Sequence, residues 1–194
     1  MFIGIYQSIT TLVIVGAFYV MDFVFMRRYD RQRQAGKGWA WDYTLLTMLM
    51  GLALILQPLL LPYLGWRTAA PIGLALQILG LVIIAASFGL HIWARTHLQK
   101  FYAERVEVQP GHRVVDTGPY ALVRHPVITS FFALAIGLFL VNPALPTLLV
   151  IVYTFWDFGR AARQEEILLS KNLPAYPAYM ERTPRFLPYL RRRK

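Results

Sequence analysis

The sequence predicts an all-α, polytopic integral membrane protein with five transmembrane helices, and two observations carry this prediction. The first is composition, because 57% of the 194 residues are hydrophobic and only 15% are charged, against about 45–50% and about 25% in soluble domains. The second is pattern, because several apolar stretches are long enough to cross a hydrocarbon core of ~30 Å. The length fits a single membrane domain over residues 1–194.

The charge balance and the lack of cysteine exclude several other classes of protein. Lys and Arg number 20 against 10 Asp and Glu, but they lie between the apolar stretches rather than over one solvated face. This distribution favours a membrane over a nucleic acid as the partner. Without cysteine, the chain has no thiol nucleophile, no disulfide framework and no cysteine-bound metal.

Five apolar stretches define the expected spans in chain order. The first follows no basic residue and precedes no small-residue cleavage site, so we expect it to stay in the protein rather than to act as a signal peptide. The prolines at residues 142–146 separate the fourth span from the fifth, because proline removes a backbone donor and turns the chain. Residues 160–173 continue the fifth helix out of the membrane, and residues 94–190 carry the motifs. The expected spans are residues 3–26, 45–64, 69–93, 127–141 and 147–159.

The positions of the basic residues predict the orientation. The segments after the first and third spans each carry five Lys and Arg, and the segment after the fifth span carries nine. The other two connections carry one and none. Because Lys and Arg favour the cytoplasmic side, we expect the N-terminus outside and the C-terminus inside. The simplest role of these charges is to orient the chain and to contact anionic lipid.

A polar segment at residues 111–126 precedes the fourth span on the cytoplasmic side. Its Gly-Pro pair makes a turn, and Pro126 starts the fourth span while keeping His125 out of the α region. The loop therefore presents backbone donors and acceptors beside Tyr120 and His125, which suits a flat heteroaromatic ring. Taken singly, Tyr120 fits an ordinary aromatic residue of the membrane interface.

A second polar segment, residues 160–166, lies on the same side and ends in two carboxylates. Neighbours on a helix differ by about 100°, so one of Glu165 and Glu166 faces inward while the other meets water or an arginine. A surface ion pair between Arg163 and Glu166 is the simpler alternative.

Metal and nucleotide sites have no support in the sequence. No two of the four histidines form an i,i+4 pair or a HExxH pattern, and no P-loop, dinucleotide fingerprint or serine elbow occurs. The four histidines are His91, His97, His112 and His125.

Short motifs follow one another in a fixed order over residues 111–188. They are Gly118-Pro119-Tyr120, Arg124-His125-Pro126, Asn142-Pro143, Glu165-Glu166, Tyr176 and Tyr179. This order and spacing resemble the isoprenylcysteine carboxyl methyltransferases and their phospholipid methyltransferase relatives. The resemblance implies S-adenosylmethionine as methyl donor, S-adenosylhomocysteine as product, and the carboxylate of a lipidated cysteine as acceptor.

The resemblance also implies roles for individual residues. Six residues would line the adenosine side of the cofactor pocket: His112, Arg113, Val114, Val115, Gly118 and Tyr120. Four residues at the start of the fourth span would close the pocket: His125, Pro126, Val127 and Ile128. Glu165 or Glu166 would hold the amino group or the ribose hydroxyls of the cofactor.

The expected chemistry depends mainly on positioning. Methyl transfer from a sulfonium is an in-line displacement that needs no metal, and an ionised carboxylate acceptor needs no general base. Arg160 is the first candidate to pair bidentately with the acceptor carboxylate and Arg124 is the second. Glu165 completes the catalytic candidates. A lipophilic acceptor would reach the site sideways from the bilayer.

Other functions stay open. The chain has Ile128 where the family usually has an aromatic residue, and residues 172–174 replace its usual Phe-Gly, so the cofactor motif is more complete than the acceptor motif. A phospholipid amine methyltransferase and an NADPH-dependent reductase of the sterol-reductase type are the enzymatic alternatives, since the reductases share Arg-His-Pro. A small membrane adaptor with a basic face is the non-enzymatic one. The expected partners are the lipid bilayer and a lipophilic acceptor, with no metal and no nucleic acid.

Overall fold

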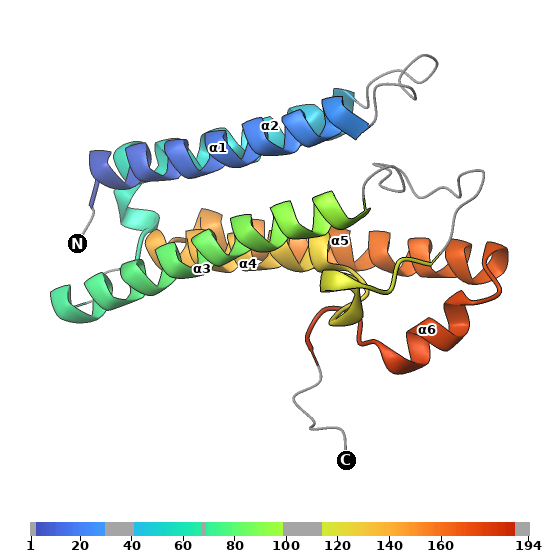
Figure 1. The fold of residues 1–194 in the computed structure, drawn as a ribbon. Coiled ribbons are helices and arrows are strands. Elements are labelled where there is room, and N and C mark those ends of the chain that lie inside the picture. Colours follow the sequence, from blue (N-terminus) through green and yellow to red (C-terminus); the bar gives the residue numbers. More distant parts are fainter. Residues whose placement is uncertain (1–2, 30–40, 67–68, 99–113, 189–194) are drawn as a thin grey trace.

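The computed structural model describes residues 3–29, 41–66, 69–98 and 114–188. Within these ranges its regular elements are all helices, which confirms the all-α prediction (Figure 1). The elements in chain order are α1 (Ile5–Tyr29), α2 (Trp41–Leu60), the short 3-10 helix η2 (Pro62–Leu64), α3 (Ala70–Leu98), the 3-10 turn η4 (Gly118–Ala121), α4 (Pro126–Val141), α5 (Leu145–Asn172) and α6 (Tyr176–Arg182).

Each expected span overlaps one of the helices α1 to α5. In the described part of the chain, two stretches are long and apolar enough to cross a membrane by length and composition, Ile5–Phe25 and Ala70–Leu98. The apolar stretches Met48–Leu60 and Pro126–Val141 are shorter. α3 is longer than the third expected span, because its last turn accommodates basic side chains that interact favourably with the C-terminal end of a helix.

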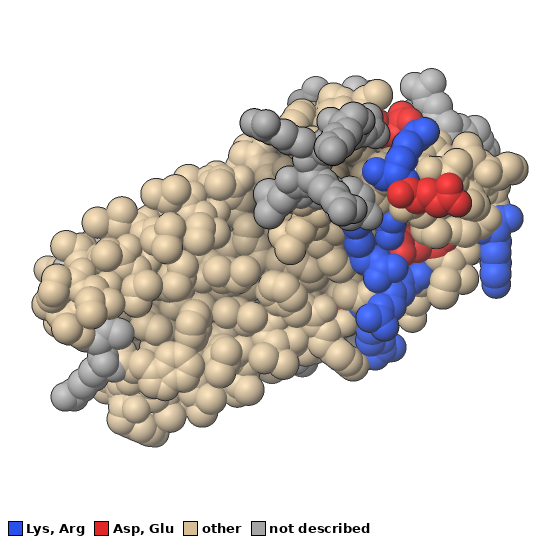
Figure 2. All heavy atoms as spheres, turned by 90° about the horizontal axis from the view of Figure 1, so that it is seen from below, with Lys and Arg blue, Asp and Glu red and all other residues tan. Residues whose placement is uncertain are grey.

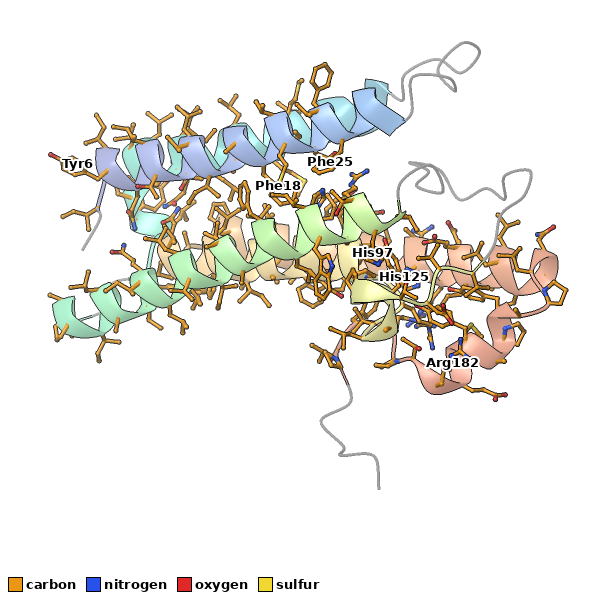
Figure 3. The ribbon with its side chains drawn as sticks, viewed as in Figure 1. Tyr6, Phe18, Phe25, His97, His125 and Arg182 are labelled. Carbon is orange, nitrogen blue, oxygen red and sulfur yellow. The ribbon has the colours of Figure 1, made fainter. Side chains whose placement is uncertain are left out.

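The helices pack in two layers. Figure 1 shows the α1–α2 pair lying along a second layer formed by α3, α4 and α5. Within the second layer α3 and α4 approach closely, since a Cβ added to Gly80 would lie 2.7 Å from the carbonyl oxygen of Gly137. Phe18 of α1 and Leu54 of α2 join Ile84 of α3 in the apolar core that connects the layers. Figure 3 shows Phe18 on the side of α1 that faces α3.

Two connections meet at one end of the bundle. The α4–α5 connection starts at Asn142, where the two nearby prolines predict a turn. The backbone N–H of Trp66 donates to the carbonyl oxygen of Pro143 at 2.8 Å, and the Asn142 amide donates to the side chain of Gln57 at 2.7 Å. The α2–α3 and α4–α5 connections therefore lie side by side, and η4, α6 and the second half of α5 lie at the opposite end (Figure 1).

The surface of the molecule also differs between its long body and the end that carries α6. Many large apolar side chains on α1, α2, α3 and α5 are exposed, among them Val20, Leu60 and Leu149. Figure 2 shows that the charged side chains on the face viewed gather at the end that carries α6, while the described residues of the long body show none on that face. This separation of apolar and charged surface is what a lipid bilayer requires.

Candidate functional site

The η4 turn is fixed by a glycine and by the last turn of α3. Gly118 has a φ of +58°, which L side chains rarely adopt. A Cβ at Gly118 would also lie 2.5 Å from the ring of His97 on α3. Pro119 and Tyr120, the next two residues of η4, are buried. The Gly-Pro turn expected from the sequence is therefore present, and it is held against α3.

The Arg-His-Pro motif forms the junction between η4 and α4. His125 is the N-cap residue of α4, and Pro126 occupies the first turn, where its missing N–H costs no hydrogen bond. His125 has φ −123° and ψ 63°, outside the α region, as expected for a residue before proline. His125 is also buried, so its ring points into the protein rather than toward water.

Residues 183–186, which we call the C-terminal strap, run alongside this junction. The N–H of Arg124 donates to the carbonyl oxygen of Pro184 at 2.8 Å, and the N–H of His125 donates to that of Arg185 at 3.1 Å. The hydroxyl of Thr129 donates to the carbonyl oxygen of Phe186 at 3.1 Å. The strap thereby satisfies backbone donors that the start of α4 leaves without a helical partner.

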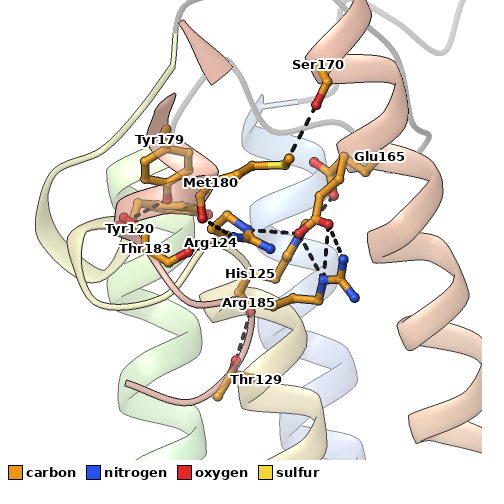
Figure 4. A network of polar contacts seen from close by, with 11 residues as sticks. Tyr120, Arg124, His125, Thr129, Glu165, Ser170, Tyr179, Met180, Thr183 and Arg185 are labelled. Carbon is orange, nitrogen blue, oxygen red and sulfur yellow. Dashed lines mark hydrogen bonds and ion pairs between the residues drawn. The ribbon is translucent and has the colours of Figure 1, made fainter. Parts of the chain in front are cut away.

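The polar network in Figure 4 brings Arg124, His125 and Arg185 together, and the carboxylate that they share is that of Glu166. Its carboxylate accepts hydrogen bonds from Arg124 Nε at 2.9 Å, from His125 Nε2 at 3.0 Å and from Arg185 Nε at 3.0 Å. The side chain of Glu166 is only 6% exposed, whereas that of Glu165 is 42% exposed and lies 3.4 Å from His125 Nδ1. The two glutamates thus face different environments, as helical geometry predicts.

The network fixes the charges of its members. Burial raises the pKa of Glu166, but the hydrogen bonds from His125 and Arg185 and the nearby positive charges outweigh it and lower the pKa to about 2. Burial lowers the pKa of His125, but the hydrogen bonds and charges of the two glutamates outweigh it, so the pKa is raised. An ionised Glu166 therefore faces a histidine whose pKa lies above its ordinary value.

Helix α6 is attached to the same network. Arg124 donates to the carbonyl oxygens of Met180 and Thr183, both at 2.7 Å. The hydroxyl of Tyr179 donates to the carbonyl oxygen of Tyr120 at 2.6 Å, which ties α6 to η4. Burial raises the pKa of the Tyr179 hydroxyl, so it remains a donor at neutral pH.

The structure places the residues expected from the sequence in three groups. Those brought together at the network are Tyr120, Arg124, His125, Pro126, Glu165 and Glu166. Those beside it are Val114 and Val115, which are half-buried before η4, Gly118 in η4, and Val127 and Ile128 in the first turn of α4. His112 and Arg113 lie outside the described residues.

Arg160 stands apart from the network. It is exposed on α5, and its guanidinium lies 4.8 Å from the centre of the Trp156 ring. Trp156 is itself 55% exposed. The pair therefore presents a positive charge beside an apolar surface on the same helix that carries both glutamates.

Sequence reasoning missed the C-terminal strap. Arg185 forms an ion pair with Glu166 although it lies far along the chain, and the sequence shows it only as one of several basic residues near the C-terminus. Thr183 and Phe186 carry no distinguishing signal either. Among the described residues, no group of three or more His, Asp or Glu side chains is arranged to hold a metal ion.

The site combines features that suit a cationic organic ligand. A half-exposed carboxylate lies beside a buried network whose own charges already have partners, so it is available to an external positive group. The fixed η4 turn and the adjoining half-buried residues supply main-chain and apolar surface next to it. Such a combination can hold a positively charged organic group beside a flat ring.

Comparisons with known proteins agree with this architecture. The sequence model of the isoprenylcysteine carboxyl methyltransferase (ICMT) family matches residues 78–171. The nickel-cobalt-cadmium resistance protein NccN of Alcaligenes xylosoxydans xylosoxydans is 33% identical over 78 residues, which cover 40% of this chain and 37% of that protein.

A solved structure shares the fold. The eukaryotic intramembrane Ras methyltransferase ICMT superposes with a TM-score of 0.68 at 20% identity, over 93% of this chain and 66% of that chain. The chain thus spans just over a third of the length of NccN and just under two thirds of that of the eukaryotic enzyme. The matched segment contains the Arg-His-Pro motif and both glutamates of the network. Residues 78–171 of this chain are therefore similar in sequence to the isoprenylcysteine carboxyl methyltransferase family, and the chain shares the fold of the eukaryotic enzyme.

Proposed function

We propose that this chain is an integral membrane methyltransferase that uses S-adenosylmethionine to methylate the carboxylate of an isoprenylcysteine-like lipid acceptor at the cytoplasmic face. The observation that carries the proposal is the network that joins His125 to Glu165 and Glu166 inside the segment that matches the family. The match to the family model supports the reaction class, and the apolar body with one charged end supports work at a membrane surface.

The residues at the network fit the cofactor. Glu165 is half-exposed beside a histidine with a raised pKa, so its carboxylate can accept hydrogen bonds from the cofactor's amino group or ribose hydroxyls. Val114, Val115, Gly118 and Tyr120 would lie along its adenosine side. When bound, S-adenosylmethionine supplies the electrophilic methyl group. Glu166 then acts by holding His125 and Arg124 in place rather than by contacting the reacting atoms.

The acceptor requires a cation at the membrane edge. Arg160 is exposed beside Trp156, and its planar guanidinium can pair bidentately with a carboxylate. Arg124 remains the second candidate, although it already holds Glu166 and two carbonyl oxygens near α6. The exposed apolar surface of α5 beside Arg160 would receive the lipid chain. The two arginines therefore divide the work, with Arg124 organising the site and Arg160 facing the acceptor.

Binding and transfer assays test the proposal directly. Purified protein in lipid nanodiscs should bind S-adenosylhomocysteine in isothermal titration and should transfer labelled methyl groups to a farnesylcysteine analogue. Phosphatidylethanolamine serves as the competing acceptor, since transfer to it would indicate an amine methyltransferase. Binding of NADPH without binding of S-adenosylhomocysteine would replace the proposal by a reductase.

We also propose five spans with an outer N-terminus and a cytoplasmic site. Single-cysteine accessibility labelling tests this topology cleanly, because the chain has no cysteine of its own. Thr117→Cys and Gln164→Cys should react from the cytoplasmic side, and Tyr63→Cys, where the native side chain is 75% exposed, from the other side. Labelling of the first two positions from opposite sides of the membrane would overturn the proposed site.

A further inference from the structure

A second polar cluster lies inside the bundle, within the apolar stretches of α1 and α3. Asp22 of α1 forms an ion pair with Arg95 of α3 and lies 3.2 Å from Nε2 of His91. The side chains of His91 and Arg95 are 0% and 1% exposed, and that of Asp22 is 24% exposed. Ionisable groups inside a membrane segment are costly and mark functional positions by default.

Hydrogen bonds connect this cluster to α4. Arg95 Nε donates to His91 Nε2 at 3.1 Å, and Nδ1 of the same ring lies within hydrogen-bond distance of Ser130 Oγ, at 2.9 Å. The Ser130 hydroxyl donates in turn to the carbonyl oxygen of Val127 at 2.6 Å. Because the Ser130 hydroxyl donates its proton to this backbone oxygen and not to His91, the cluster is not arranged as a Ser-His-Asp nucleophile.

The chain of bonds ends in the first turn of α4. Val127 comes two residues after His125, the N-cap residue whose ring contacts Glu165 and Glu166. Ser87 of α3 secures the same turn, because its hydroxyl donates to the carbonyl oxygen of Ser130 at 2.8 Å. The aromatic rings of Phe18, Phe25 and Phe131 lie edge-on around His91, with the nearest ring centre 4.8 Å away, and keep water out. Figure 3 shows Phe18 and Phe25 on the side of α1 that faces α3.

We propose that Asp22 is a positioning residue, which acts through His91 and Ser130 to hold the first turn of α4, and hence His125, in register with Glu165 and Glu166. The helix that carries Asp22 lies outside the segment matched by the family, so a part of the chain beyond that segment sets the geometry of the site. Only the measurement of cofactor binding rests on the proposed function, and the titration of His125 does not.

Two variants interrupt the chain of bonds at different points. Asp22→Asn removes the charge that pairs with Arg95, and Ser130→Ala removes the link between His91 and α4. Each should weaken binding of S-adenosylhomocysteine about tenfold, and the double variant should lose no more than the stronger single one, because both cut the same connection. Asp22→Glu keeps the charge and should restore most of the affinity.

The titration midpoint of His125 in the folded protein provides a second measurement, because a loss of stability alone does not change it. The charged groups that face its ring are Glu165 and Glu166 from α5, Arg185 from the strap and Arg124 beside it. In ring-labelled protein, with the resonance assigned through His125→Gln, both variants should lower the titration midpoint of His125. Gln7→Ala is the matched control, because Gln7 of α1 donates to the carbonyl oxygen of Val141 at the far end of α4, 3.3 Å away. It should change neither measurement.

The outcomes separate the two proposals. Unchanged affinity and unchanged His125 titration in folded Asp22→Asn and Ser130→Ala would overturn the inference, and so would equal effects in Gln7→Ala. If the wild-type protein binds no S-adenosylhomocysteine, the proposed function fails while the His125 titration still decides the inference. If Asp22→Asn does not fold, Ser130→Ala and Ser87→Ala carry the test, because they keep every charge.

Discussion

Two clusters in this molecule combine an arginine, a histidine and a carboxylate, and they differ in what they leave exposed. Around Glu166 the buried charges have partners, and a second carboxylate, Glu165, stays 42% exposed beside His125. Around Asp22 the histidine and the arginine of α3 are almost fully buried and no further carboxylate of the described residues is at hand. The same side-chain chemistry therefore leaves a partly exposed carboxylate in the first cluster and is used up in contacts between helices in the second.

The largest expected effect follows from removing the central carboxylate of the first cluster. Glu166→Ala should lower the free energy of unfolding by about 3–5 kcal/mol, because it leaves buried cations without their partner. Denaturant unfolding in detergent measures this loss. Glu165→Ala is the matched control and should change stability by less than about 0.5 kcal/mol. Equal losses of unfolding free energy in both variants would contradict the different roles given to the buried and the exposed carboxylate.

The pH dependence of stability sharpens the same distinction. The pKa of Glu166 in the folded protein is about 2, below its usual value of 4.5. Its contribution is therefore complete above pH 4.5 and is lost as the pH falls toward 2. The difference in unfolding free energy between wild type and Glu166→Gln should shrink over that range and vanish near its lower end. A difference that stays constant down to the lowest pH would show that the carboxylate is not ionised by these contacts.

His125 responds in the opposite sense. Its pKa is raised in the folded protein, so its contribution is complete at low pH and is lost as the pH rises through the folded value.

Glu165→Gln tests whether the exposed carboxylate serves a ligand. The variant should weaken binding of S-adenosylhomocysteine about tenfold, since a charge-assisted hydrogen bond becomes a neutral one. Stability should hardly change, because the side chain is partly in water. Isothermal titration together with thermal unfolding separates the two effects. A loss of stability with unchanged affinity would give Glu165 the same role as Glu166.

Arg160→Lys has the smallest expected effect and lies outside both clusters. Lysine keeps the charge but loses the planar fork, so turnover with an identified acceptor should fall about fivefold while cofactor affinity stays the same. Steady-state kinetics with labelled donor gives both values. Equal turnover in the two proteins would remove Arg160 from the acceptor site.

Much of the fold was predictable because its signals are local. Apolar stretches, prolines at residues 142–146 and the Arg-His-Pro junction are each read within a few neighbouring residues, and the helices follow them. The ends of helices were less predictable. α3 continues to Leu98 because a helix needs only backbone hydrogen bonds to go on, and polar side chains near its end do not stop it.

The site was predictable only where its residues are close in sequence. His125 follows Arg124, and the two glutamates are adjacent, so their helical positions could be compared directly. Arg185 and Asp22 join their clusters through tertiary packing, which no spacing in the sequence encodes. Whether Glu165 or Glu166 faces inward likewise depends on which side of α5 packs against α4, and the structure settles it in favour of Glu166.

The C-terminal strap has a consequence for biosynthesis. Its residues follow every helix described, yet they supply Arg185 to Glu166 and accept the backbone donors of Arg124 and His125. A nascent chain that has completed α1 to α5 therefore still lacks the partners that the strap supplies to Glu166, Arg124 and His125. The network can close only after the strap itself has been made, so a ribosome stalled before residue 183 would hold a chain whose Glu166 lacks Arg185.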